Sequence, residues 1–330
     1  MKKILLLATG GTIASVESSE GLIPQLGIDK LLNSVVGITE YYDVTAKDIL
    51  HLDSSNIQPE QWQVIAQNVY EQYKNYDGMV ITHGTDTMAY TTSVLAYMLR
   101  NIPIPIVVTG SQLPILNPIT DAAENLRCAF AMAASGVAGV YLAFNRKVIL
   151  GARAVKVRTV GFDAFESVNS EYAATISSNG LIINHSVIPK LTGKPELLDK
   201  LCPAVFLIKL TPGLNPEIFD MLLGMNYKGI VIEAFGAGGM HYIHRDLISK
   251  LERISQHGIS VVVCSQCLYE RSDFSIYETG RKVLEKGAIQ GYDMTTEAAI
   301  TKLIWALGQT DDKEEIRKIF STNLVGEITL

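Results

Sequence analysis

The chain has 330 residues, a net charge of −6 at pH 7, 48% hydrophobic residues and 19% charged residues. This composition excludes intrinsic disorder, which requires low hydrophobicity and high net charge. It also disfavours electrostatic binding of nucleic acid, because the surplus of Lys and Arg that neutralises phosphates is missing. No apolar run approaches the roughly 18 residues that span a bilayer, so we expect no membrane segment.

Apolar, β-branched runs that end at a glycine or a polar turn recur through the first half of the chain. These expected strands are Lys3–Ala8, Val44–Leu52, Gly78–Thr82, Ile104–Val108, Val140–Phe144 and Val148–Val155. A helical pattern covers Asp121–Ser135. Runs that are apolar throughout are typical of parallel strands buried on both faces beneath helices. The pattern therefore predicts an α/β fold whose large N-terminal domain has a parallel sheet in three layers.

The pattern weakens from His185 to Pro203, a stretch with three prolines and no convincing strand. We expect an N-terminal α/β catalytic domain at 1–184, a linker at 185–203 and a smaller C-terminal α/β domain at 204–330. In the second domain the expected strands are Ala204–Leu210, Lys228–Ala234 and Ile259–Cys264, and the expected helix is Thr296–Leu307.

Polar side chains follow several strands of the first domain, at the edge where parallel sheets bind ligands. They are Thr12, Asp53, Ser54, Ser55, Thr85, Asp86 and Lys156. A threonine hydroxyl is a weak nucleophile that needs a base. A lysine with a lowered pKa can be that base, and an aspartate can orient the lysine. The set therefore suits hydroxyl-nucleophile chemistry, with backbone N–H groups of glycine-rich turns available for an oxyanion hole.

A purely structural interpretation exists for each of these residues. The two threonines and Asp86 can cap helices, and the serine pair can belong to a turn. An isolated lysine such as Lys156 is usually a solvated surface charge.

Other motifs are weaker. Cys264 and Cys267 form a CxxC pair without the second pair that a structural zinc site needs, and His241 and His244 lack a third ligand at informative spacing. The glycine-rich stretch Phe235–His241 departs from the dinucleotide-binding fingerprint at its last glycine. We therefore expect neither a metal nor a cofactor. Four cysteines without an export signal predict reduced thiols and a cytoplasmic location.

Several segments carry the motifs of a known family. They are ATGGTIAS at 8–15, ITHGTDTMAY at 81–90, VVTGSQLP at 107–114, VGFDAFES at 160–167, YETGR at 277–281 and DMTTEAAITKL at 293–303. These segments resemble the L-asparaginases of the bacterial-type superfamily, nearest to its cytoplasmic type I and archaeal branch. The combination of TGGTIA with HGTDT is highly specific, and the resemblance covers both expected domains.

The resemblance implies hydrolysis of L-asparagine to L-aspartate and ammonia, without cofactor or metal, in a homodimer or homotetramer with active sites near the subunit interface. By matching position, it implies that Thr12 is the nucleophile and that Thr85, Lys156 and Asp86 form a Thr-Lys-Asp triad. The implied substrate-binding residues are Asp53, Ser54, Ser55, Thr85 and Asp86.

The chain departs from the family pattern beside the loop glycine Gly21. Many members have a tyrosine there that contacts the nucleophile, whereas this chain has Leu22, which carries no hydroxyl. We expect Tyr277, within YETGR, to supply the missing hydroxyl. The chain also has no evident equivalent of the C-terminal glutamate that contacts the substrate's amino group in periplasmic members, as suits the cytoplasmic branch.

A second departure concerns the site at which allosteric type I members bind asparagine. Glu233 stands where those members have an arginine, and Val155 where they have a threonine, whereas Cys267 and Lys302 match. We therefore expect no activation by asparagine.

Two other functions share the fold. The amidase component of a tRNA-dependent amidotransferase has a similar core after an extra N-terminal domain, for which we expect no room because the first strand begins at residue 3. A sensor module without catalysis would be consistent with Leu22. It is disfavoured because the chain keeps Thr12, Thr85, Asp86 and Lys156.

Overall fold

The computed structural model describes residues 1–18, 21–24, 26–274, 276 and 278–329. Tyr277, the expected source of the missing hydroxyl, lies outside the described residues. The chain forms two compact units, Met1–Asp199 and Lys200–Leu330. Each unit has its own sheet and its own hydrophobic core.

The first unit is built around an eight-stranded sheet. Its strands are β1 (Lys2–Gly10), β4 (Tyr42–Leu52), β5 (Gly78–Thr82), β7 (Pro105–Thr109), β8 (Gly139–Phe144), β9 (Lys147–Leu150), β12 (Ala174–Ser177) and β13 (Gly180–Ile183). They lie in the order β13-β12-β9-β8-β7-β5-β1-β4. From β8 to β4 every neighbouring pair is parallel, whereas β9, β12 and β13 pair antiparallel at the other edge.

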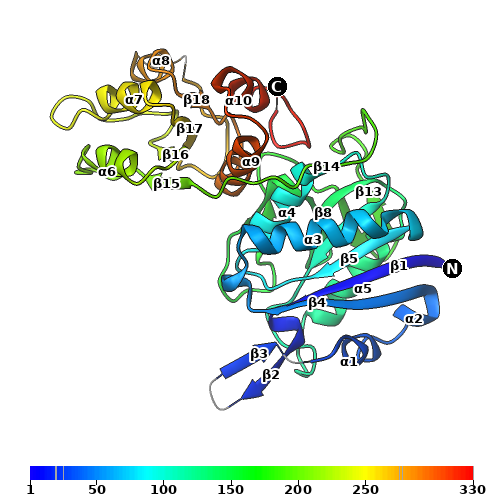
Figure 1. The fold of residues 1–330 in the computed structure, drawn as a ribbon. Helices are drawn as coiled ribbons and strands as arrows, with labels where there is room; N and C mark the ends of the chain where they lie inside the picture. The colour runs from blue at the N-terminus through cyan, green and yellow to red at the C-terminus, as the bar shows by residue number, and fades with distance from the viewer. Residues whose placement is uncertain (19–20, 25, 275, 277, 330) are drawn as a thin grey trace. The chain divides into compact units, whose positions relative to one another are not determined.

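Both faces of this sheet are covered by helices (Figure 1). The helices are α1 (Ile28–Asn33), α2 (Ile38–Tyr41), α3 (Pro59–Gln72), α4 (Met88–Met98) and α5 (Ala122–Ala133). Along β1, Ile4 and Leu6 pack in one core cluster with residues of α1 and α5. Leu5 and Leu7 point to the opposite face, because side chains alternate along a strand, and they are equally buried. The predicted three-layer α/β fold is confirmed.

Short paired strands complete the first unit. They are β2 (Ser15–Ser18) with β3 (Gly21–Pro24), β10 (Ala154–Lys156) with β11 (Phe165–Ser167), and β6 (Leu99–Arg100) with β14 (Glu196–Leu197). The strand β14 lies inside the stretch expected to be a linker. Two residues are too few to give a hydrophobic periodicity, and the pairing with β6 joins positions about 100 residues apart in sequence.

The second unit contains a four-stranded parallel sheet in the order β15-β16-β17-β18. Its elements are β15 (Val205–Lys209), α6 (Ile218–Gly224), β16 (Gly229–Ala234), α7 (Leu247–Gln256), β17 (Ser260–Ser265), α8 (Glu278–Glu285), β18 (Ile289–Gln290), α9 (Thr296–Gln309) and α10 (Lys313–Phe320). No described helix in either unit combines the length and the apolarity needed to cross a membrane.

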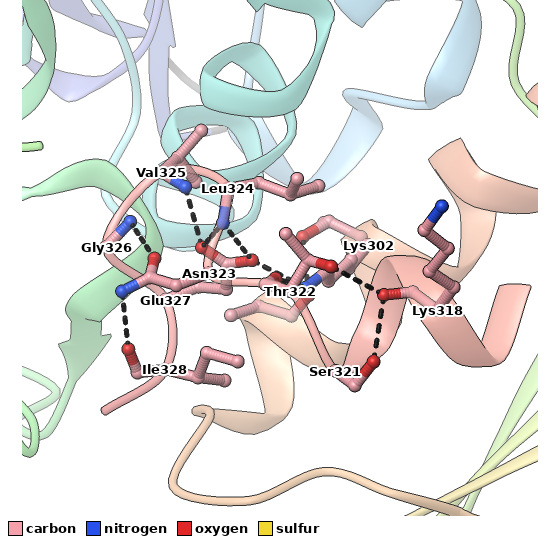
Figure 2. A network of polar contacts seen from close by, with 12 residues as sticks. Lys302, Lys318, Ser321, Thr322, Asn323, Leu324, Val325, Gly326, Glu327 and Ile328 are labelled. Carbon is pink, nitrogen blue, oxygen red and sulfur yellow. Dashed lines mark hydrogen bonds and ion pairs between the residues drawn. The ribbon is translucent and has the colours of Figure 1, made fainter. Parts of the chain in front are cut away.

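A buried ion pair fastens the C-terminal segment of the second unit to α9 (Figure 2). The Lys302 ammonium lies 2.5 Å from a carboxylate oxygen of Glu327, and both side chains are fully buried. The carboxylate also accepts hydrogen bonds from the backbone N–H groups of Leu324 and Val325 at 3.0 and 2.7 Å. Lys302 donates a further hydrogen bond to the carbonyl oxygen of Thr322 at 3.0 Å. Lys302, which matches the family's second site by sequence, therefore has no exposed surface to offer a ligand.

We predict that Glu327→Gln lowers the free energy of unfolding by about 3–5 kcal/mol, because it removes the carboxylate that pairs with the buried Lys302 ammonium. Chemical denaturation of the full chain measures the change. Glu278→Gln is the matched control, because Glu278 pairs with Lys282 on the exposed surface of α8, where the expected loss is below about 1 kcal/mol. Equal losses in the two variants would contradict the prediction.

Candidate active site

Three loops meet at the carboxyl ends of the neighbouring strands β5, β1 and β4. A Cβ atom added to Gly11 would lie 2.6 Å from the Cα atom of Gly84, and Gly11 has a φ of 81°. A Cβ atom added to Gly84 would lie 2.6 Å from the Ser54 hydroxyl oxygen. Only glycine therefore fits at these two positions. Their close approach brings together the loops that carry the predicted residues Thr12, Asp53–Ser55 and Thr85–Asp86.

The Asp53–Ser55 loop fixes the neighbouring Asp86 turn. Ser54 is only 3% exposed, and its hydroxyl accepts a hydrogen bond from the Asp86 backbone N–H at 3.2 Å. The Ser54 carbonyl accepts another from the Thr87 hydroxyl at 2.7 Å. Asp53 caps the 3₁₀ turn η2 (Ser54–Asn56), because one carboxylate oxygen accepts from the Ser55 backbone N–H at 2.8 Å and from its hydroxyl at 2.6 Å. Asp53 and Ser55 are exposed, whereas Ser54 is enclosed.

Lys156, the last residue of β10, brings the three expected triad residues into contact. Its ammonium nitrogen lies 2.8 Å from the Thr85 hydroxyl oxygen and 2.6 Å from a carboxylate oxygen of Asp86. The Lys156 side chain is 18% exposed, whereas that of Asp86 is 64% exposed. The cluster therefore has a largely enclosed amine, a buried hydroxyl and a carboxylate that is open to a ligand.

These contacts exclude helix capping by Thr12, Thr85 and Asp86, and they exclude a solvated Lys156. The helix α4 is preceded by Thr87 as its N-cap, so neither Thr85 nor Asp86 caps it. Lys156 is held by two polar partners rather than solvated. Thr12 is the first residue of the 3₁₀ turn η1 (Thr12–Ala14), whose N-cap is Gly11.

Gln112 is a site residue to which sequence reasoning gave no role. Its side-chain nitrogen donates hydrogen bonds to the carbonyl oxygens of Thr159 and Gly161 at 3.1 and 3.0 Å. The amide oxygen is therefore left to accept from the Thr85 hydroxyl, at 3.3 Å. Gln112 follows the carboxyl end of β7, a position that could have marked it as a candidate.

His83 lies fully buried next to Gly84, beneath the Thr85 turn. Its ring nitrogen Nδ1 is 2.7 Å from the Gly84 carbonyl oxygen. Burial lowers the pKa of His83 from 6.5 to about 4, against smaller opposing effects of the Gly84 carbonyl and the Asp53 carboxylate. The imidazole therefore stays neutral at physiological pH.

The cysteine pair and Glu233 of the second unit lie outside the cluster around Lys156, and their contacts are as follows. Cys264 is buried, which raises the pKa of its thiol to about 12, whereas Cys267 is exposed. The Glu233 carboxylate on β16 accepts a hydrogen bond from the Thr296 hydroxyl at 2.6 Å and pairs with Lys209 at 3.3 Å. Within the described ranges, no group of three or more His, Cys, Asp or Glu side chains is arranged to hold a metal ion.

Comparison with known families shows that both units match the same family. The model of the asparaginase N-terminal domain matches residues 3–189. The model of the glutaminase/asparaginase C-terminal domain matches residues 204–320. The resemblance inferred from the sequence motifs is confirmed.

Individual relatives align over the whole chain. The L-asparaginase of Thermococcus kodakarensis is 45% identical, with 99% of each chain covered. Its solved structure superimposes with a TM-score of 0.94 at 44% identity, again over 99% of each chain. L-asparaginase I from Vibrio cholerae superimposes with a TM-score of 0.88 at 31% identity, over 100% of this chain and 99% of that one. A glutamyl-tRNA(Gln) amidotransferase component from Methanosphaera stadtmanae is 38% identical, over 99% of this chain and 77% of that protein.

We predict that His83 makes the folded state less stable as the pH falls from about 6.5 to 4. In this range the unfolded chain binds a proton that the folded chain does not, so stability present above pH 6.5 is lost on acidification, by about 3 kcal/mol in total. Chemical denaturation across this range should show a smaller pH-dependent loss for His83→Gln than for the wild type. His185→Gln, at an exposed histidine, should keep the wild-type dependence. Identical pH dependence in wild type and His83→Gln would refute the assignment.

Proposed function

The chain belongs to the asparaginase family, and on that premise we propose that it hydrolyses L-asparagine to L-aspartate and ammonia. The observation that carries the proposal is the contact of the Lys156 amine with both the Thr85 hydroxyl and the Asp86 carboxylate, at 2.8 and 2.6 Å. An enclosed amine between a hydroxyl and a carboxylate is the arrangement that proton transfer to and from an oxygen nucleophile requires.

In the proposed mechanism, the Thr12 hydroxyl oxygen attacks the side-chain amide carbon of asparagine. Thr85 and Lys156 carry the hydroxyl proton from Thr12 to the leaving nitrogen, so that ammonia departs and an acyl ester on Thr12 remains. Water then attacks the ester, with Thr85 and Lys156 again moving the proton, and releases aspartate. Before proton transfer the Thr85 hydroxyl donates its hydrogen to the Gln112 amide oxygen, which holds the side chain in place, and it turns toward Lys156 when the proton moves.

We propose that the substrate's α-amino group binds at the two exposed carboxylates and that its α-carboxylate binds at the neighbouring hydroxyl donor. The Asp86 side chain is 64% exposed and can receive the substrate's α-amino group while it holds Lys156. Asp53 and Ser55 are exposed on the adjacent loop and are proposed to contact the α-amino and α-carboxylate groups. Ser54 is proposed to act indirectly, because its hydroxyl is enclosed and holds the Asp86 backbone N–H.

The proposal also covers the oligomeric state, the missing hydroxyl and the cellular location. We propose a homodimer or homotetramer as the working form, and Tyr277 as the source of the hydroxyl that Leu22 lacks. A cytoplasmic location is supported by the likeness to a probable cytoplasmic L-asparaginase from Campylobacter jejuni, with a TM-score of 0.85 at 26% identity. Cofactor and metal have no part in the mechanism.

A second candidate function is the amidase role of a tRNA-dependent amidotransferase. It is favoured by the 38% identity to the Methanosphaera stadtmanae amidotransferase component, of which the chain spans 77%. Such a component would release ammonia from its amide substrate under the control of tRNA and a partner protein.

We predict that the purified chain releases ammonia from L-asparagine by itself. Lys156→Met should lower kcat by at least about 10²-fold, because it removes the proton carrier. Thr12→Ala should remove turnover altogether. Lys74→Met, at an exposed lysine of the same unit, is the control and should retain wild-type kcat.

Absence of turnover with both L-asparagine and L-glutamine, in protein that binds aspartate, would refute the proposed activity. Turnover that appears only with tRNA and a partner protein would establish the second candidate function. Full activity of Lys156→Met would overturn the role of the lysine while leaving the reaction intact.

The rate should depend hyperbolically on asparagine concentration. The carboxylate of Glu233 repels the substrate carboxylate that an arginine would bind, and Lys302 is enclosed with Glu327. Initial rates over a wide range of asparagine concentration test this, and a sigmoidal curve with a Hill coefficient well above 1 would contradict it.

A further inference from the structure

A chain of buried hydrogen bonds leads from α3 to the Thr85 turn. The Trp62 indole nitrogen lies 3.0 Å from the Thr91 hydroxyl oxygen, which lies 3.0 Å from Nε2 of His83. Nδ1 of His83 in turn lies 2.7 Å from the carbonyl oxygen of Gly84. Thr91 and His83 are fully buried, and Trp62 is 6% exposed. None of the three side chains belongs to the proposed triad.

The two ends of this chain fix the direction of every bond in it. An indole N–H can only donate and a carbonyl oxygen can only accept. Thr91 therefore accepts from Trp62 and donates its single hydroxyl hydrogen to Nε2 of His83. His83 must then carry its proton on Nδ1 and donate it to the Gly84 carbonyl. Thr91 and His83 each use one donor and one acceptor, and the neutral Nδ1–H tautomer of His83 is the form that satisfies every bond.

The hydrogen bond to the Gly84 carbonyl bears on the position of Thr85, the next residue. The Gly84 backbone is closely packed against Gly11 on one side and Ser54 on another. In a trans peptide the C=O and the following N–H point in opposite directions. The bond from His83 to the Gly84 carbonyl therefore also fixes the direction of the Thr85 N–H and the point from which the Thr85 side chain starts.

We propose that Trp62, Thr91 and His83 form a positioning relay that sets the Gly84–Thr85 peptide and so holds the Thr85 hydroxyl between Lys156 and Gln112. The relay deepens the proposed function and rests on it, since its purpose is to align Thr85 for proton transfer. None of its members touches substrate, so they are positioning residues rather than catalytic residues.

The relay requires neutral His83. A proton on Nε2 would point at the Thr91 oxygen, which already accepts from Trp62, and would leave the Thr91 hydrogen without its acceptor. The buried surroundings hold the pKa of His83 at about 4, despite the opposing effect of the Asp53 carboxylate. The relay is therefore complete at physiological pH.

The experiment compares two neighbouring threonines of α4. Thr91→Val removes the middle hydroxyl of the relay at nearly constant volume. Thr92→Val makes the same change at an equally buried threonine, whose hydroxyl donates to the carbonyl of Met88 inside the helix. We expect Thr91→Val to lower kcat for asparagine by about 10- to 100-fold with KM changed less than about threefold, because misplacement of a reacting group by a fraction of an ångström acts on the chemical step. Thr92→Val should keep wild-type kcat, and Thr91→Ser should restore it.

A spectroscopic readout accompanies the kinetics. The ¹⁵N chemical shifts of His83 should show the Nδ1–H tautomer from pH 7 down to about 5 in the wild type. In Thr91→Val the Nε2 shift should move toward that of a nitrogen without a hydrogen-bond donor. If Thr91→Val does not fold, Thr91→Ala, which also removes the hydroxyl that donates to Nε2, takes its place with the same expectations.

Several outcomes would overturn the relay. They are an unchanged kcat in folded Thr91→Val, equal losses in Thr91→Val and Thr92→Val, and an Nε2–H tautomer in the wild type. Failure of the proposed function is distinguishable, because it would abolish turnover in the wild type while the His83 tautomer and its response to Thr91→Val remained measurable.

Discussion

The close approach of Gly84 to Gly11 and Ser54 is the constraint from which the rest of the site follows. Neighbouring strands of a sheet lie about 4.8 Å apart, so loops that leave them side by side have little room unless side chains are absent. Gly11 and Gly84 remove those side chains, and a Cβ atom at Gly11 would come within 2.6 Å of the Gly84 Cα atom. The loops can then share hydrogen bonds, such as that from the Asp86 backbone N–H to the Ser54 hydroxyl.

The close packing of these loops also determines how far Lys156, Asp86 and His83 are exposed to solvent. The Lys156 amine is 18% exposed and contacts the Asp86 carboxylate, which keeps an open side toward solvent. A fully solvated lysine would not be held against Thr85, and a fully enclosed pair would leave the Asp86 carboxylate no face for a ligand. The partly open geometry provides both contacts. In the same unit His83 is fully enclosed, and burial lowers its pKa so that the imidazole is neutral at physiological pH.

The sequence predicts the central strands β1, β5, β7 and β8 well because they are short, continuous apolar runs. The expected strand Gly78–Thr82 agrees with β5 at both ends, and the parallel arrangement then indicates that loops after different strands converge. The contact of Lys156 with Thr85 could therefore be expected from the order of the strands. The contact of Gln112 with Thr85 could not, because it depends on carbonyl groups about 50 residues away that turn the Gln112 amide oxygen toward Thr85. The relay from Trp62 to Gly84 is hidden for the same reason, since its members come from two helices and a strand end.

A residue that matches a family position in sequence does not by itself show that the family's ligand site is present. Lys302 matches the family's second ligand site by sequence, yet its ammonium is fully enclosed against Glu327 and fastens the C-terminal segment. Glu233 differs from the expected arginine in charge, and its carboxylate is engaged by Thr296 and Lys209. To bind a carboxylate ligand at these residues, the chain would have to expose the buried Lys302 ammonium and neutralise the Glu233 carboxylate. Each change costs several kcal/mol for an enclosed group. The identity of Lys302 is therefore explained by the packing of α9 rather than by a ligand, and the environment of each side chain decides which family property it keeps.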